Sequence, residues 1–226
     1  EVGGMYTGPA LDCAKNWWTN VARAFKDNPY VWFDMYNEPN TTKEIWNSSY
    51  QTIINAIRST GNTSLIVASG NYWGQDANNW SCDNVTDANS AILTSSLNDP
   101  AGNLVYSIHA YDQWMQCQSK LDNYLDRVAA QGKSILIGEY GIVNNNNVQP
   151  VEDHVLTSTQ SRKVGRISWA FWGGDQNDLT TNGNGGIQNC SYDTNGNCTS
   201  LSTYGQKVWN DNQRSESLAD QSTNCK

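Results

Sequence analysis

Two glutamates that follow apolar segments are the residues of this sequence best suited to chemistry. Glu38 closes a β-forming run at residues 30–36, and Glu139 closes the apolar run at residues 135–137. An ionised carboxylate at the end of a buried strand costs desolvation energy, so two such cases indicate that the carboxylates have a task. Two carboxyl groups can cleave a glycosidic bond, because one protonates the departing oxygen while the other attacks the anomeric carbon or activates water. Glu38 alone would more simply be a helix cap or rim residue, and its pairing with Glu139 favours catalysis.

The spacing of apolar residues predicts helices and strands in alternation. Apolar positions recur at helical spacing over residues 9–26, and Thr42 can cap a second helix that Gly61 closes. Further helices are predicted at residues 119–131, from Pro150 onward, and more weakly at residues 201–214. Strands are predicted at residues 30–36, 65–68, 104–108, 135–137 and 166–171. Because crossovers between parallel strands are nearly always right-handed, this order predicts a doubly wound sheet or a (β/α)8 barrel.

The placement of polar and aromatic residues favours the barrel. Such residues follow the predicted strands at their C-terminal ends, where the chemistry of (β/α)8 enzymes takes place; they are Asn37, Glu38, His109, Tyr111, Glu139 and Trp172. We therefore expect an α/β fold of the (β/α)8 TIM-barrel type in one catalytic domain over residues 1–226. A complete barrel has eight strands, so the expected barrel is incomplete, with about five of eight β/α units and the first three strands missing.

The charge and hydropathy of the chain exclude several kinds of partner. A formal net charge of -8 leaves no basic stripe for phosphates, so a nucleic-acid partner is not expected. No run approaches the roughly 18 apolar residues of a membrane span, and the first residues lack the pattern of a signal peptide. We expect a neutral ligand and no membrane association.

The cysteines and the glycosylation triplets favour an extracellular protein. None of the six cysteines lies in a C-x-x-C pair or at metal-ligand spacing from a histidine, so neither a metal nor an organic cofactor is expected. An even number of cysteines suits disulfide bonds and secretion, with Cys190 and Cys198 able to close a short loop. Seven asparagines begin N-x-S/T triplets, and chance explains several in an Asn-rich chain; they are Asn40, Asn47, Asn62, Asn79, Asn84, Asn189 and Asn197.

Four segments, in order, resemble glycoside hydrolase family 5, a family of (β/α)8 retaining glycosidases. They are Asn37-Glu38-Pro39, His109-Ala110-Tyr111, residues 137–141 around Glu139, and residues 168–172, which end in Trp172. The resemblance assigns them to strands four, six, seven and eight of the barrel. An isolated Asn-Glu-Pro is weak evidence, whereas four segments in family order are specific.

The resemblance implies a role for each of these residues. Glu38 would be the general acid/base, Glu139 the nucleophile, and Asn37 a ligand of the 2-hydroxyl of the sugar that is cleaved. Tyr111, His109 and Trp172 would complete the substrate-binding site. Tyr111 would donate a hydrogen bond to Glu139, His109 would orient the carboxylates, and Trp172 would be the platform under the sugar. Trp73, Trp80 and Trp114 also follow strand ends and could line flanking subsites, with ordinary packing as the alternative.

The resemblance leads us to expect retaining, endoglucanase-like (cellulase-like) hydrolysis of a β-1,4-linked glucan, with a polysaccharide or oligosaccharide as substrate. A β-mannanase or an exo-acting β-glucosidase of the same family is the alternative. A non-catalytic sugar-binding remnant is another, because the Arg and His that the family supplies from its early strands are not in this sequence. An unrelated doubly wound protein would need a nucleotide site, and no Gly-rich phosphate loop opens a predicted helix.

The missing strands lead to two further expectations. The sequence would be either a fragment of a longer gene or a natural short form. Open sheet edges expose unpaired backbone and apolar surface, which favours pairing with another chain. We therefore predict a homo-oligomer that covers the open barrel edges.

Overall fold

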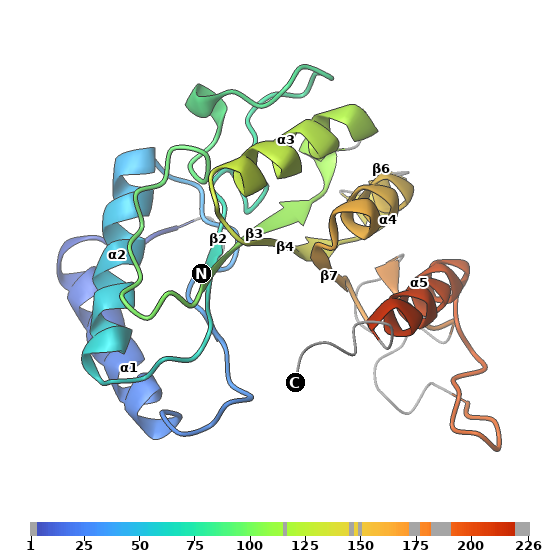
Figure 1. The fold of residues 1–226 in the computed structure, drawn as a ribbon, viewed down its shortest axis with the longest axis horizontal. Helices are drawn as coiled ribbons and strands as arrows, with labels where there is room; N and C mark the ends of the chain where they lie inside the picture. The colour runs from blue at the N-terminus through green and yellow to red at the C-terminus, as the bar shows by residue number, and fades with distance from the viewer. Residues whose placement is uncertain are drawn as a thin grey trace.

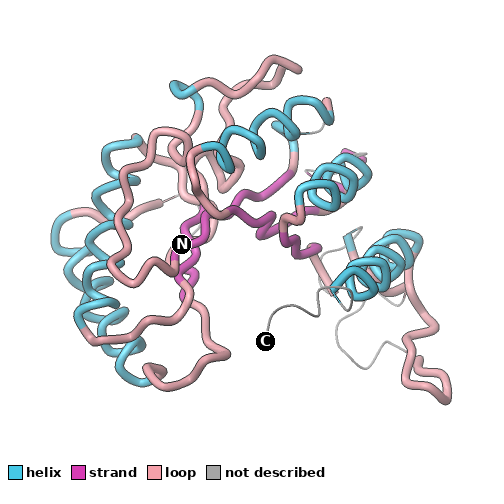
Figure 2. Tube along the Cα trace, viewed as in Figure 1, coloured by secondary structure: helices cyan, strands magenta, loops and turns pink. Residues whose placement is uncertain are grey.

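A curled sheet of five parallel strands forms the centre of the molecule (Figure 1). The computed structural model describes residues 4–114, 117–144, 147–148, 151–171, 177–181 and 191–219. Within these ranges the sheet has the order β1-β2-β3-β4-β7; the strands are Phe33–Asp34, Ile66–Ser69, Leu104–Ala110, Ile135–Tyr140 and Gly165–Ser168. The strands follow an arc, and the helices lie outside it (Figure 2). This is part of a (β/α)8 barrel, as the sequence predicts.

The helices begin close to the predicted residues, and the last helix continues past its predicted end at residue 214. Their bounds are Gly8–Ala24 for α1, Lys43–Ser59 for α2, Gln118–Ala130 for α3, Val151–Arg162 for α4 and Thr203–Ala219 for α5. Thr42 caps α2 as expected, since its hydroxyl accepts a hydrogen bond of 3.3 Å from the backbone N–H of Ile45. Gly61 follows the end of α2 with a φ of +77°, a conformation that glycine adopts without a Cβ penalty.

Helix α2 attaches to the sheet through its buried face. Trp46 and Tyr50 on that face are fully buried, and each donates a hydrogen bond of 3.0 Å to the backbone oxygen of Ser69. Ser69 ends β2, so these bonds fix the point where the chain leaves the sheet. The position of α2 therefore sets the start of the loop that follows β2.

A buried ion pair closes the opposite end of the sheet. Arg58 and Asp99 form two hydrogen bonds, of 2.6 and 2.8 Å, and their side chains are only 5% and 2% exposed. The Arg58 guanidinium also donates to the backbone oxygens of Asn62, Ser64 and Asn103. Burial alone would raise the pKa of Asp99, but bonds from Arg58 and from two backbone N–H groups hold it below its ordinary value.

The two outer strands are shorter than predicted. β1 covers two residues of the predicted 30–36, and β7 ends at Ser168 instead of residue 171. Each pairs with one neighbour within the described residues, and only the paired stretch acquires the regular geometry of a strand. A small hairpin of β5 (Val143–Asn144) and β6 (Asn147–Val148) was not predicted. Within the ranges given above, every helix is too short or too polar to cross a bilayer.

Candidate active site

Glu38 lies just beyond the C-terminal end of β1 in an unusual backbone conformation. Its φ is +46°, in the left-handed region that side chains with a Cβ rarely adopt. The loop after β2 lies against it, because the N–H of Trp73 donates a 3.0 Å hydrogen bond to the oxygen of Pro39. Backbone strain of this kind is typical of functional sites, where surrounding contacts maintain it.

Glu139 reaches the same region through an irregularity between β3 and β4. Ile108 pairs with Ile137, but His109 pairs with Glu139, so Gly138 is an extra residue on β4. A Cβ at Gly138 would lie 2.1 Å from the hydroxyl of Ser107, so only glycine fits this bulge. The bulge brings Glu139 opposite His109, as bulges near active sites commonly redirect a side chain.

Glu38 and Glu139, hereafter the carboxylate pair, are bridged by His109, and Tyr111 contacts Glu139. His109 Nδ1 lies 3.0 Å from Glu38 Oε1 and 3.5 Å from Glu139 Oε2, and the residue is 4% exposed. Tyr111 donates a 2.7 Å hydrogen bond to Glu139 Oε1. The contacts predicted for His109 and Tyr111 are thus present.

The spacing of the carboxylate pair constrains the chemistry. One oxygen of each carboxylate, together with a ring nitrogen of His109, lies in a group whose members are all within 4.8 Å of one another. Retaining glycosidases place their carboxyl groups about 5 to 5.5 Å apart, whereas inverting enzymes leave about 6.5 to 9.5 Å for a water molecule. The observed spacing suits direct attack by one carboxylate.

Tyr111 keeps its proton beside the carboxylate. Burial raises the pKa of Tyr111 well above its ordinary value, and the neighbouring charge of Glu139 and the hydrogen bond to it raise it further. The phenol therefore stays protonated, and a hydrogen-bond donor, at neutral pH. A donor fixed in this way stabilises negative charge on Glu139.

The loop after β2 supports the other side of the pair. Gly74 has a φ of +72°, and a Cβ there would lie 3.0 Å from His109 Cγ and 3.3 Å from Glu38 Cγ. The oxygen of Gly74 also accepts a 2.9 Å hydrogen bond from the N–H of His109. Tyr72 and Trp73 in the same loop have positive φ values as well. The loop can therefore lie this close to His109 and Glu38 because Gly74 has no side chain.

A buried carboxylate anchors this loop from below. Asp76 is fully buried and accepts hydrogen bonds from the side chains of Ser90 and Tyr124 and from the backbone N–H groups of Asn71 and Ala91. Burial raises the pKa of Asp76 to about 6, although these hydrogen bonds lower it. We infer that Asp76 fixes the loop in place and takes no part in the chemistry, because it has no access to the cleft.

The carboxylate pair opens into a cleft of about 1120 Å³. Its walls carry aromatic rings and side-chain amides, a combination that suits sugars. The aromatic residues are Tyr72, Trp73, Trp80, Tyr111 and Trp169, and the amides are Asn37, Asn40, Gln75, Asn78, Gln113 and Asn177. Asn37 and Trp73 thus lie where the sequence predicted them, and Trp73 is 49% exposed.

One of the predicted tryptophans does not line the cleft, and another lies outside the described residues. The prediction for Trp114 is wrong: it is fully buried, and its indole N–H donates to the oxygen of Gln75. It packs on Tyr124 of α3 instead. Trp172 lies outside the described residues. From the same segment, Trp169 is 46% exposed and lines the cleft.

Trp169 was missed because β7 ends three residues earlier than predicted. Residue 169 is the first after Ser168, the last residue of the strand. The sequence pattern extended the strand to residue 171 and so assigned its end to Trp172. A strand bounded at Ser168 would have indicated Trp169.

The cysteines are partly accounted for by the described structure. Cys82 and Cys117 form a disulfide bond, and Cys198 is also disulfide-bonded. Cys13 is an exposed free thiol. Cys190 and Cys225 lie outside the described residues. The expected disulfide chemistry is therefore present in this chain.

The three groups at the centre of the site could also hold a cation. A carboxylate oxygen from each member of the carboxylate pair and a nitrogen of His109 form a donor set that divalent metals accept. An ion there would occupy the space between the carboxylates. A bound metal would therefore compete with chemistry performed by the pair itself.

The fold and the site together define a class of protein: a (β/α)8-type structure with paired carboxylates at the C-terminal ends of parallel strands. The family model described as "Cellulase (glycosyl hydrolase family 5)" matches residues 5–175. The chain belongs to this family.

Relatives of this chain act, by their names, on two polysaccharides. The chain is 29% identical to the mannan endo-1,4-beta-mannosidase of Streptomyces lividans over 192 residues, which are 77% of this chain and 48% of that protein. It is 27% identical to endoglucanase 1 of Robillarda sp. over 172 residues, which are 69% of this chain and 44% of that protein. The chain thus spans less than half the length of these relatives.

A solved structure agrees with the fold. The beta-mannanase from Streptomyces thermolilacinus, crystallised with mannohexaose, superposes with a TM-score of 0.69 at 25% identity and covers 92% of this chain. This chain covers 64% of that protein. The comparison supports the assignment of the five strands to part of a (β/α)8 barrel.

Proposed function

We propose that this chain is the catalytic part of a secreted, retaining endo-glycanase that hydrolyses a β-1,4-linked polysaccharide. The observation that carries the proposal is the carboxylate pair, in which one oxygen of Glu38 lies within 4.8 Å of one oxygen of Glu139 and His109 contacts both residues. Membership of glycosyl hydrolase family 5 supports the same reaction class. The open cleft, with aromatic rings on its walls, favours a polymer over a small glycoside.

The proposed mechanism is a double displacement. In the first step a carboxylate oxygen of Glu139 bonds to the anomeric carbon while the bond to the departing oxygen breaks, and Glu38 transfers its proton to that oxygen. In the second step Glu38 takes a proton from water, the water oxygen bonds to the anomeric carbon, and the bond to Glu139 breaks. Both steps invert the carbon, so the product keeps the β configuration.

The neighbours of the pair have roles that follow from their contacts. Tyr111 donates to Glu139 and so keeps the nucleophile oriented and ionised. His109 contacts both carboxylates and orients them. Asn37 offers a donor and an acceptor to the 2-hydroxyl of the reacting sugar, and Trp169 offers a flat apolar face to its ring.

Glucan and mannan are the two candidate substrates. The sequence leads us to expect β-1,4-glucan as the substrate, and relatives include an endoglucanase. Mannan is the second candidate, because other relatives are named mannan endo-1,4-beta-mannosidases. The two polymers differ at the 2-hydroxyl, so the contacts of Asn37 and its neighbours would decide between them.

The test is release of reducing sugar from carboxymethylcellulose, barley β-glucan and mannan. We expect the purified chain to act on at least one polymer, and Glu139→Gln to abolish that activity. A proton NMR spectrum of the first product should show the β-anomer. Activity that survives in Glu139→Gln would refute the mechanism, and an α-anomer would refute retention. Binding without hydrolysis by the unaltered chain would favour a non-catalytic sugar-binding remnant.

A further inference from the structure

Trp80 is a large, exposed aromatic residue on the wall of the cleft that the proposed chemistry does not use. Its side chain is 61% exposed. It lies with Asn78 and Gln113 among the residues that line the cleft. A single exposed aromatic ring is common on a protein surface, and what distinguishes Trp80 is its place in the cleft that holds the carboxylate pair.

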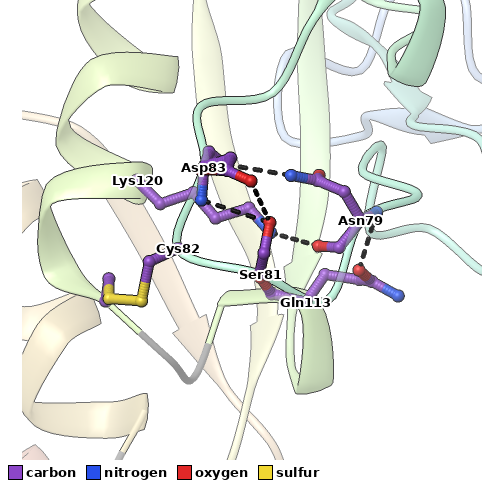
Figure 3. The surroundings of a disulfide bond; sticks show 7 residues. Asn79, Ser81, Cys82, Asp83, Gln113 and Lys120 are labelled. Carbon is purple, nitrogen blue, oxygen red and sulfur yellow. Dashed lines mark hydrogen bonds between the residues drawn. A yellow bond between two sulfur atoms is a disulfide. The ribbon is translucent and has the colours of Figure 1, made fainter.

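The residue before Trp80 is fixed from the interior. Lys120 on α3 is fully buried, and its ammonium donates hydrogen bonds to the backbone oxygens of Asn79 and Gln113. Gln113 completes the link, since its side-chain oxygen accepts a 3.1 Å hydrogen bond from the N–H of Asn79. Figure 3 shows these groups gathered around the loop. Both sides of the Asn79 peptide backbone are therefore held.

The residues after Trp80 are fixed by a covalent bond. Cys82 forms a disulfide with Cys117, the residue that precedes α3 (Figure 3). Across Cys82, the Ser81 hydroxyl donates a 2.8 Å hydrogen bond to the carboxylate of Asp83. Asp83 also accepts a 3.0 Å bond from the Asn79 side chain through its backbone oxygen. Trp80 is thus bracketed by an anchored peptide on one side and a disulfide on the other.

The buried position of Lys120 makes its hydrogen bonds energetically important. Its ammonium lies 5.5 Å from the centre of the Trp114 ring, and burial lowers the pKa of Lys120 to about 8. Placing a cation there is unfavourable unless its hydrogen bonds are made. The bonds that it makes are those that order the Trp80 loop.

The loop lies on the Glu38 side of the cleft. Gly74, six residues before Trp80, lies so close to Glu38 and His109 that a Cβ there would come within 3.3 Å of both, and Gln75, Asn78 and Trp80 after it line the cleft. In the proposed mechanism Glu38 protonates the departing oxygen, so Glu38 faces the part of the polysaccharide that leaves. Trp80 lies further along the same loop and lines the same cleft, so we expect its ring to face that leaving part.

We propose that Trp80 is an outlying sugar-binding platform for the leaving part of the polysaccharide chain, held in position by Lys120 and by the disulfide between Cys82 and Cys117. The flat face of an indole fits the C–H face of a pyranose, and a fixed ring binds without the entropy cost of ordering a loop. The proposal rests on the proposed function for the direction of the chain. Trp80 extends the site beyond the reacting sugar.

The test compares Trp80→Ala with Trp32→Ala. Trp32 is 57% exposed and lines a separate hollow with Leu65 and Asn103, before the N-terminal ends of the strands. The substrates are cellohexaose or mannohexaose and an aryl β-glycoside, whose leaving group is too short to extend along the wall. We expect Trp80→Ala to lower the ratio of hexaose to aryl-glycoside kcat/KM about tenfold. Trp32→Ala should leave the ratio unchanged.

A binding measurement separates this proposal from the proposed function. In a Glu139→Gln background, calorimetry with the two hexaoses measures affinity without turnover, and the added Trp80→Ala should weaken it about tenfold. A chain that hydrolyses nothing, yet binds a hexaose through Trp80, would refute the proposed function and leave the platform standing. Unchanged affinity and an unchanged ratio in Trp80→Ala would overturn the platform.

The anchoring is tested separately. Replacing both cysteines, Cys82→Ser with Cys117→Ser, should weaken hexaose binding in the same direction as Trp80→Ala, by about threefold or more, because the ring must then be ordered on binding. Lys120→Met should do the same. A second measurement, near-UV circular dichroism, confirms that each variant is folded. Folded variants with unchanged hexaose affinity would refute the role of these anchors.

Discussion

Replacing Gly74 with alanine should damage the site through one methyl group. The residue has a φ of +72°, which costs an alanine about 1 to 2 kcal/mol. Its Cβ would lie 3.0 Å from His109 Cγ and 3.1 Å from His109 Nδ1, whereas carbon atoms pack best at about 3.5 to 4.0 Å. The imidazole would have to move by about 0.5 Å or more, which lengthens its 3.0 Å contact with Glu38.

The expected result is a loss of both stability and activity. Because a displacement of about 1 Å at a reacting group can cost about a hundredfold in rate, we expect kcat/KM on the polymer to fall about tenfold to a hundredfold. The melting temperature should fall by several degrees, since about 1 to 2 kcal/mol corresponds to that range for a domain of this size. Initial rates and thermal unfolding of the purified variant measure the two effects.

Gly132→Ala is the matched control. Gly132 has a φ of +69°, close to that of Gly74. Apart from its chain neighbours and its own helix, no described atom would lie within 4 Å of a methyl group added there. It should lose similar stability and keep its kcat/KM. If Gly74→Ala keeps kcat/KM within about twofold of the Gly132→Ala value, the steric argument is wrong.

Four other outcomes follow from the structure. Tyr111→Phe should lower kcat about tenfold to a hundredfold with a smaller effect on KM, because a hydrogen bond to a charged group is worth about 1.5 to 3 kcal/mol; an unchanged kcat would show that this bond is dispensable. Asp99→Ala should lower the free energy of unfolding, measured by urea denaturation, by about 3 kcal/mol or more, since it leaves the buried charge of Arg58 without an opposite charge. Because the pKa of Asp99 is lowered in the folded state, its contribution is full above the unfolded-state pKa and is lost as the pH falls through the folded-state pKa. Zn²⁺ or Cu²⁺ should inhibit competitively by binding between His109 and the carboxylate pair, with reversal by a chelator, whereas inhibition of a purely non-competitive kind would place the ion elsewhere. The homo-oligomer predicted from the open barrel edges stays a prediction, and light scattering that gives a monomeric mass would count against it.

Much of the site could be predicted because its residues lie at the C-terminal ends of strands. Parallel strands present these ends on one side of a sheet, so residues just after β1 and the last residues of β3 and β4 had to come close together. Glu38, His109 and Glu139 were identified by this rule, and their contacts are as expected. The cap at Thr42 was likewise predictable, because it depends on neighbours only three residues away.

The tryptophans show where that rule stops. Following a strand end does not fix the direction of a side chain, which depends on what packs against it. Trp114 points inward because its ring packs on Tyr124 and its indole N–H donates to the oxygen of Gln75. Trp80 lies on the cleft wall, where Lys120 of α3 fixes the preceding residue. Both residues had the same sequence signal and reached opposite environments.

The sequence by itself determined the alternation of helices and strands and the gathering of polar residues at one end of the sheet, because both follow from periodicity and chain direction. Only the tertiary structure decided that Gly74 must lack a side chain, that a bulge at Gly138 brings Glu139 opposite His109, and that Asp76 anchors the loop between them. Each of these depends on atoms that are distant along the chain and meet only after the strands have paired.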